Sequence, residues 1–114
     1  MPDVTDRFAG KVAIVTGGGS GIGRDVAHGY AAGGGSVVVV GRRLEPLEET
    51  AAANPDRIAA VRGDVGEPGE AARLVAAAVE RFGRIDAVVN NAGRWDIVAF
   101  DERALAPAEA LRRR

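Results

Sequence analysis

The residues best suited to chemistry are a dense cluster of glycines at residues 16–23, with the sequence Thr-Gly-Gly-Gly-Ser-Gly-Ile-Gly. Glycine lets the backbone approach a ligand closely, so that N–H groups can hold phosphate oxygens. One glycine allows a tight turn, one removes a Cβ from the path of a pyrophosphate, and Gly23 lets a helix lie close to the preceding strand. We call residues 16–23 the glycine turn. The spacing is Gly-x-x-x-Gly-x-Gly, and a glycine-rich turn without a ligand is the alternative.

The segments on either side of the glycine turn favour phosphate binding. Residues 11–16 form a β-branched run that is typical of a buried strand. Residues 20–32 have helical character, which the three glycines at 33–35 bring to an end. In an open α/β sheet, the phosphates of a nucleotide lie between such a strand and the N-terminus of such a helix.

The rest of the chain continues the alternation of strand and helix. We predict further strands at residues 37–40, 57–62 and 85–90, and further helices at residues 44–53 and 67–82. The strand at 37–40 is apolar throughout, which indicates that both of its faces are covered. The sequence therefore predicts an α/β fold: a Rossmann-like, doubly wound parallel sheet of about four strands in three layers.

Residues 101–114 are compatible with a tail helix that ends in three arginines, with no strand after it. We therefore expect one domain, residues 1–114, that stops after the fourth strand and this tail helix. Such an incomplete sheet would leave residues 85–90 as an open apolar edge, which favours self-association.

Composition excludes several classes of function. The chain has 15 basic and 16 acidic residues, so its net charge gives no reason to expect binding to nucleic acid or to membranes. It has no cysteine, which excludes disulfides and thiolate metal sites, and the lone histidine, His28, argues against any metal site. No signal peptide and no run of about 20 apolar residues is present. We expect a cytoplasmic protein.

Three motifs in register resemble the classical short-chain dehydrogenase/reductase family over about residues 8–93. They are the glycine turn, the pair Asp64-Val65 after the third strand, and Asn90-Asn91-Ala92-Gly93 after the fourth. The resemblance implies that Asp64 lies near the amino group of an adenine, and that the asparagine segment braces the sheet beside the cofactor. Taken alone, Asp64 could be a cap and Asn90 part of a turn. The cofactor-binding residues expected from the resemblance are Thr16, Gly17, Gly19, Ser20, Gly21, Ile22, Gly23, Arg42, Asp64, Val65, Asn90, Ala92 and Gly93.

The end of the second strand bears on which nicotinamide cofactor is bound. An acid about 20 residues after the glycine turn would select NAD by bonding the ribose 2′-hydroxyl. Gly41 stands at that position and Arg42 follows it. A guanidinium can hold a 2′-phosphate, so we favour NADP over NAD. Ser20, however, stands where many NADP-preferring relatives carry a second basic residue, and Arg42 could simply be a solvated residue at the start of a helix.

The resemblance also implies a proton donor that these residues do not include. In the family a tyrosine transfers the proton, a lysine four residues later tunes it, and a serine and a helix asparagine assist. The only tyrosine is Tyr30, with Gly34 four residues later, and the only lysine is Lys11. We assign no catalytic residue. The sequence therefore favours an NADP-type oxidoreductase for carbonyl or alcohol substrates, present as a fragment; the alternatives are a non-catalytic NADP(H)-binding module and a truncated product that does not fold stably.

Overall fold

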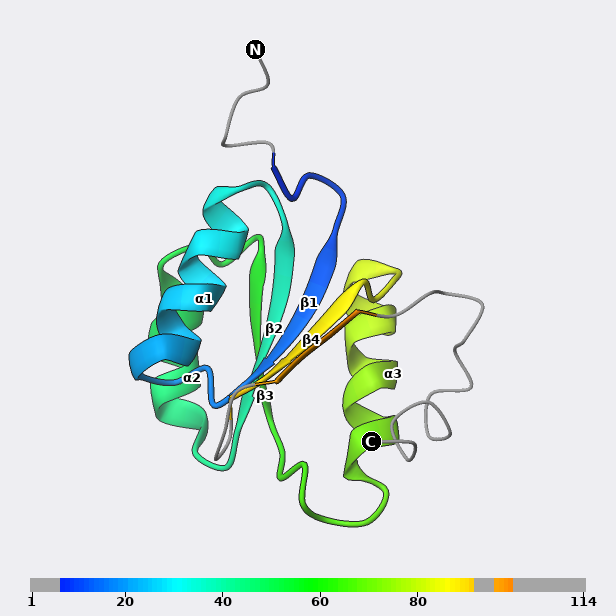
Figure 1. The fold of residues 1–114 in the computed structure, drawn as a ribbon. Helices are drawn as coiled ribbons and strands as arrows, with labels where there is room; N and C mark the ends of the chain where they lie inside the picture. Colours follow the sequence, from blue (N-terminus) through cyan, green and yellow to red (C-terminus); the bar gives the residue numbers. More distant parts are fainter. Residues whose placement is uncertain (1–6, 92–95, 100–114) are drawn as a thin grey trace.

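A central sheet lies between two layers of helices in the structure, a computed structural model that describes residues 7–91 and 96–99 (Figure 1). Strands and helices alternate along the chain up to the fourth strand. The strands are β1 Val12–Thr16, β2 Ser36–Gly41, β3 Ile58–Arg62, β4 Ala87–Asn90 and β5 Asp96–Ala99. The helices are α1 Gly21–Ala32, α2 Leu44–Ala52 and α3 Glu70–Phe82.

The sheet has the strand order β3-β2-β1-β4-β5. β1 pairs in parallel with β2 on one side and with β4 on the other, and β2 pairs in parallel with β3. The predicted set of four parallel strands in a Rossmann-like fold is confirmed. Because the carboxyl ends of parallel strands meet at one edge, the loops that follow β1, β2, β3 and β4 all begin on the same side of the molecule.

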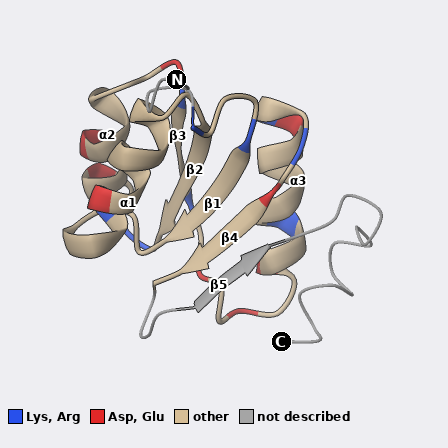
Figure 2. Ribbon diagram, turned by 45° about the horizontal axis from the view of Figure 1, so that its top comes forward, with Lys and Arg blue, Asp and Glu red and all other residues tan. Residues whose placement is uncertain are grey.

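Each face of the sheet has its own apolar core, since successive side chains of a strand point to opposite faces. Val15, Val37 and Val39 face α1 and α2, where they pack with Ala27, Leu47 and other buried residues. Ile14, Val38 and Val40 face α3, where they pack with Leu74, Val75 and Ala78. Burial of each such valine or leucine contributes about 1.5–3 kcal/mol. The charged residues lie mainly on the helices and loops (Figure 2), and β1, β2 and β4 contain none.

Two element boundaries differ from those predicted by more than one residue. The third helix begins at Glu70 rather than at residue 67, because Gly69 adopts φ +81° and the chain before it forms a turn closed by the bond from Glu67 N to Asp64 O (3.0 Å). The fourth strand begins at Ala87 rather than at residue 85. Ile85 is buried in the core on the α3 face without being part of the ladder.

The prediction that residues 85–90 form an open edge is wrong. β5 pairs with β4 in antiparallel orientation, with Val89 opposite Ile97 and Asn90 opposite Asp96. An antiparallel strand can follow after a short connection, here residues 91–95, whereas another parallel strand would need a crossover of a dozen or more residues. The outer edges of the described sheet are therefore β3 and β5. Self-association stays a prediction, and the expected tail helix at 101–114 lies outside the described residues.

Candidate functional site

The glycine turn connects the end of β1 to the start of α1, at the carboxyl edge of the parallel strands (Figure 1). The N–H of Gly17 donates to the carbonyl of Val40 at 2.8 Å, so the turn begins as a continuation of the β1–β2 ladder. Gly17 and Gly21 have φ angles of +67° and +55°, a conformation that side chains strongly disfavour. The backbone therefore requires glycine at both ends of the bend.

The glycines of the turn differ in what surrounds them. A Cβ at Gly23 would collide with the carbonyl oxygen of Gly17, which explains how closely α1 can approach the turn. A Cβ at Gly18 would lie 2.7 Å from Val39, and one at Gly19 would lie 2.8 Å from Pro46 of α2. Gly21 alone of the turn's glycines has nothing within 4 Å of such a Cβ among the described residues. The open space at the start of α1 thus lies over Gly21.

The end of β4 meets the glycine turn at Thr16. The Thr16 hydroxyl lies 3.0 Å from Asn90 Oδ1 and 3.4 Å from the Val89 carbonyl, and it accepts from the Asn91 N–H at 2.9 Å. Asn91 Nδ2 also donates to the Gly17 carbonyl at 3.5 Å. The structure therefore brings together two motifs that are more than 70 residues apart in the sequence. Asn91 belongs to the quoted asparagine motif but was not among the expected binding residues; Ala92 and Gly93 lie outside the described part of the chain.

Asp64 and Val65 lie in the loop between β3 and α3. Asp64 Oδ1 accepts from the Gly66 N–H at 2.9 Å, which is the turn-capping role that the aspartate could have by itself. Its own N–H donates to Glu70 Oε1 at 3.3 Å, and the side chain of Val65 is 38% exposed. The loop is therefore ordered by its own hydrogen bonds while it presents an apolar side chain to solvent.

Glu70 fixes this loop to the first turn of α3. It is held by Arg73, whose Nε and Nη2 lie 2.6 and 2.9 Å from its carboxylate oxygens. The hydrogen bond from Arg73, followed by that from Asp64 N–H, lowers the pKa of Glu70 to about 2. Arg73 Nη2 also donates to the Arg62 carbonyl at 2.8 Å. The pair therefore ties the end of β3 to α3.

Arg42 lies just beyond β2, next to the end of β3. The carbonyl of Gly41 accepts from the Gly63 N–H at 2.9 Å, so the two strand ends are joined. The side chain of Arg42 is exposed, and it makes no hydrogen bond or ion pair with any residue in 7–91 or 96–99. Its guanidinium is therefore available to an anion at this edge of the sheet.

Tyr30 and Lys11 lie away from this edge. Lys11 precedes β1, whereas the glycine turn follows it. Tyr30 is near the end of α1 and stacks on Phe8, with ring centroids 4.4 Å apart. Burial, together with the charge of Asp86, raises the pKa of Tyr30, which opposes ionisation of the phenol. Neither residue is placed for proton transfer near the glycine turn.

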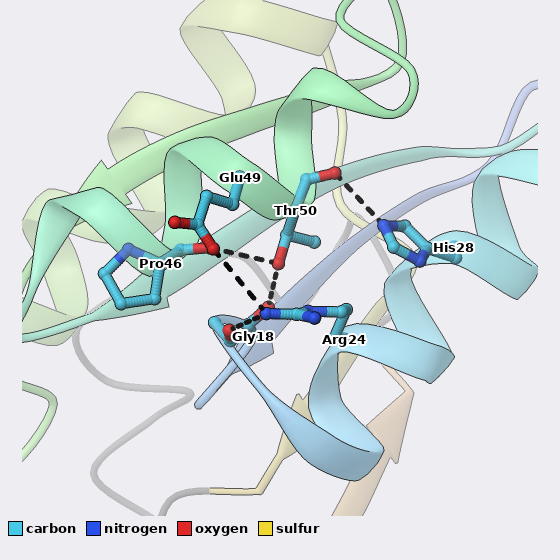
Figure 3. Close-up of polar contacts among 7 residues, drawn as sticks. Gly18, Arg24, His28, Pro46, Glu49 and Thr50 are labelled. Carbon is cyan, nitrogen blue, oxygen red and sulfur yellow. Dashed lines mark hydrogen bonds and ion pairs between the residues drawn. The ribbon is translucent and has the colours of Figure 1, made fainter.

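Two further residues contact the glycine turn that the sequence motifs did not indicate. Thr50 of α2 donates to the Gly18 carbonyl at 2.8 Å, and Arg24 of α1 donates to the Gly19 carbonyl at 2.9 Å (Figure 3). A lone threonine in the middle of a predicted helix carries no signal of such a contact. Within the described ranges, no group of three or more His, Cys, Asp or Glu side chains could hold a metal ion, and no helix is long and apolar enough to span a membrane.

Comparison with known proteins places this chain in a family. The profile of the short chain dehydrogenase family matches residues 11–111. Ketoacyl reductase 2, as assigned for the granaticin polyketide synthase of Streptomyces violaceoruber, is 49% identical over 109 residues, which cover 95% of this chain and 43% of that protein. The chain thus has the fold and the glycine turn of an NAD(P)-type oxidoreductase. It belongs to the short-chain dehydrogenase/reductase family.

Solved structures agree with this assignment. The C-domain of a bacterial malonyl-CoA reductase with NADP superposes with a TM-score of 0.75 at 34% identity, over 81% of this chain and 16% of that one. The 3-ketoacyl-(acyl-carrier-protein) reductase of Brucella melitensis, complexed with NADH, gives a TM-score of 0.69 at 38% identity, over 72% of this chain and 34% of that one. This chain spans less than half the length of each of these three proteins.

Proposed function

We propose that this chain is the cofactor-binding part of a short-chain oxidoreductase, that it binds a nicotinamide dinucleotide at the glycine turn, and that it prefers NADP(H). The observation that carries the proposal is the open space over Gly21, at the N-terminus of α1 and the carboxyl edge of the sheet. Backbone N–H groups and the positive end of the helix dipole favour a pyrophosphate there. Asp64 and Val65 would then lie at the adenine.

The preference for NADP(H) rests on Gly41 and Arg42. Gly41 ends β2 at the position where a carboxylate would repel a 2′-phosphate, and it has no side chain. The exposed guanidinium of Arg42 could form charge-assisted hydrogen bonds with that phosphate. The two solved relatives hold NADP in one case and NADH in the other, so the family alone leaves the choice to these residues.

Replacement of Arg42 tests this preference. We expect Arg42→Ala to weaken the binding of NADPH by about 1.5–3 kcal/mol, since a charge-assisted contact is lost. The binding of NADH should change little. Isothermal titration of both cofactors measures the difference, and Arg43→Ala, which removes a neighbouring guanidinium that is also exposed, is the matched control.

Equal losses of NADPH and NADH affinity in Arg42→Ala would contradict the preference. Equal effects of the Arg42 and Arg43 substitutions would show that the arginines act only through general charge. Failure of the parent chain to bind either cofactor would contradict the proposed function as a whole.

The proposed reaction is hydride transfer between NADP(H) and a carbonyl or alcohol substrate, in a protein that includes further residues of the family fold. Bound nicotinamide supplies the hydride acceptor or donor. In this proposal, residues 1–114 form a single domain that binds and orients the dinucleotide. We propose that the protein acts in the cytoplasm. A second candidate is a non-catalytic NADP(H)-binding module, which would use the same glycine turn without hydride transfer.

A further inference from the structure

Thr50 is a fully buried residue of α2, with 0% of its surface exposed, yet its side chain bonds to the glycine turn. Its hydroxyl lies 2.8 Å from the carbonyl oxygen of Gly18 and 3.2 Å from that of Pro46, one turn earlier in α2 (Figure 3). A hydroxyl has one proton to donate, and the shorter contact is the one to Gly18. The main polar contact of Thr50 is therefore with another element of the fold.

This bond fixes the direction of a whole peptide unit. In a trans peptide, the C=O of one residue and the N–H of the next point in opposite directions. The Gly18 carbonyl is held toward α2, so the N–H of Gly19 must point away from α2. Arg24 Nη2 holds the Gly19 carbonyl at 2.9 Å, which fixes the N–H of Ser20 in the same way.

Neither of these N–H groups has a hydrogen-bond partner in the described part of the protein. Among residues 7–91 and 96–99, no hydrogen bond is donated by the N–H of Gly19 or of Ser20. Both belong to the turn that leads into α1, where the first N–H groups also have no partner in the helix. The turn thus presents two N–H donors, of which that of Gly19 points away from α2.

The Gly18–Gly19 peptide would otherwise rotate easily. Neither residue has a side chain, so no Cβ resists a flip of the peptide plane. Thr50 is itself held in place, because its carbonyl accepts from His28 Nε2 of α1 at 3.2 Å. A carbonyl can only accept, so this ring nitrogen carries the proton. His28, Thr50 and Gly18 therefore form a chain of contacts from α1 through α2 to the turn (Figure 3).

We propose that Thr50 is a positioning residue for the cofactor: its buried hydroxyl holds the Gly18–Gly19 peptide in the orientation that presents the Gly19 N–H to a phosphate of the dinucleotide. The inference rests on the proposed function, and it deepens that function by assigning a role to a residue of α2. Thr50 is fully buried and would not itself touch the cofactor. Arg24 supports the next peptide, but its Nε is buried without a partner among the described residues, so its loss would have mixed effects.

The test uses two substitutions of the 114-residue chain. Thr50→Val keeps the size and the β-branch but removes the hydroxyl; Thr50→Ser keeps the hydroxyl and is the matched control. NADPH is titrated into each chain by calorimetry, and the ¹⁵N-resolved amide signal of Gly19 is followed during the titration. Thermal unfolding of each chain gives the folded fraction at the temperature of the titration.

We expect Thr50→Val to weaken NADPH binding about tenfold, and Thr50→Ser to stay within a factor of about three of the parent. The Gly19 amide signal should move on NADPH binding in the parent and in Thr50→Ser, and much less in Thr50→Val. A role in stability alone would lower the melting temperature without changing the affinity per folded molecule.

Equal affinity of Thr50→Val and the parent would overturn the inference and leave the proposed function intact. The inference is also overturned if Thr50→Ser binds as weakly as Thr50→Val, or if the loss in Thr50→Val equals its loss of folded protein. If the parent binds neither NADPH nor NADH, the proposed function fails, and the inference fails with it.

Discussion

The glycines of the turn are not interchangeable. A substitution at one of them affects mainly the packing of the fold, whereas a substitution at another affects the proposed binding site. Gly23 has no room for a side chain because the Gly17 carbonyl lies against it, so a substitution there must disturb the packing of α1. Gly21 has open space and a φ of +55°, so a substitution there must strain the backbone and fill the space over the turn. Only the second change acts directly on the proposed phosphate site.

We therefore expect Gly21→Val to abolish NADPH binding and to lower the stability of the chain by about 1–2 kcal/mol, the cost of a side chain in the left-handed region. Gly10→Val is the control, because Gly10 has a φ of +76°, equally open space and a position before β1, away from the turn. Calorimetric titration and chemical unfolding of both variants separate the two effects. If both variants bind NADPH like the parent, the site is not over Gly21.

At residue scale, the sequence alone pointed to most of the candidate site, since Thr16 to Gly23, Asp64 and Asn90 occur in recognisable motifs, and their role in binding stays a prediction. Thr50 could not be predicted. Its contact with Gly18 joins residues 32 positions apart and exists only because α2 docks against the turn. A threonine inside a helix gives no local sign of a partner in another element, and the same holds for Arg24.

At the scale of elements, β1 is held at its start by a clamp of charged groups. Asp86 Oδ2 accepts from the Val12 N–H at 2.8 Å, and both carboxylate oxygens accept from Arg84 at 2.9 and 2.6 Å. Burial alone would raise the pKa of Asp86, but the hydrogen bonds from Arg84 and Val12, with the charges of Arg84 and Lys11, hold it below its ordinary value. The ionised carboxylate therefore stabilises the pairing of β1 with β4.

This clamp predicts an acid-dependent stability. Because the folded pKa of Asp86 is lowered, its contribution is fully present above the unfolded value of about 3.9 and is lost as the pH falls through the folded value. We expect Asp86→Asn, which keeps an acceptor for Val12 but not the charge facing Arg84, to be less stable than the parent above about pH 4, with the difference shrinking at lower pH. Urea unfolding at a series of pH values measures this. Asp56→Asn, at an exposed site, is the control. A difference in stability between the parent and Asp86→Asn that stays constant with pH would contradict the clamp.

The elements with strong local signals were predicted well. The apolar runs of β1 and β2 and the three- and four-residue spacing in α3 follow from burial on both faces of a sheet and on one face of a helix. β5 was missed, since its four residues pair with β4 through a backbone ladder that depends on the position of β4 rather than on their own pattern. The start of α3 was missed because Gly69, with a positive φ, interrupts the helix before the apolar stripe begins.

At the scale of the whole molecule, the sheet separates the proposed cofactor site from the only tyrosine and the only lysine. β1 has five residues, about 17 Å of extended chain, with Lys11 before it and the glycine turn after it. Tyr30 lies on Phe8, near the same end of the sheet as Lys11. A bound nicotinamide would therefore have no proton donor of the family type from these residues.

We expect the 114-residue chain by itself to bind NADPH without catalysing the reduction of ketones or the oxidation of alcohols. Absorbance at the nicotinamide band, recorded with a panel of carbonyl and alcohol substrates, measures turnover. Asn90→Ala is the control for a contaminating enzyme, because a trace of another reductase would not respond to a substitution in this chain. Turnover that survives repurification and is lost in Asn90→Ala would show that these residues contain a proton donor of another kind.

The hydrogen bonds of Thr16 also determine when the glycine turn can be completed during synthesis of the chain. Its hydroxyl is bonded to Asn90 and Asn91, which follow it by 74 and 75 positions, so the glycine turn leaves the ribosome long before the residues that complete it. Contacts between such distant residues form late, because a long loop must close first. A nascent chain that ends before β4 would contain the residues of β1, α1 and β2 but lack those that complete the turn. Cofactor binding during synthesis would then mark the moment at which β4 has joined the sheet.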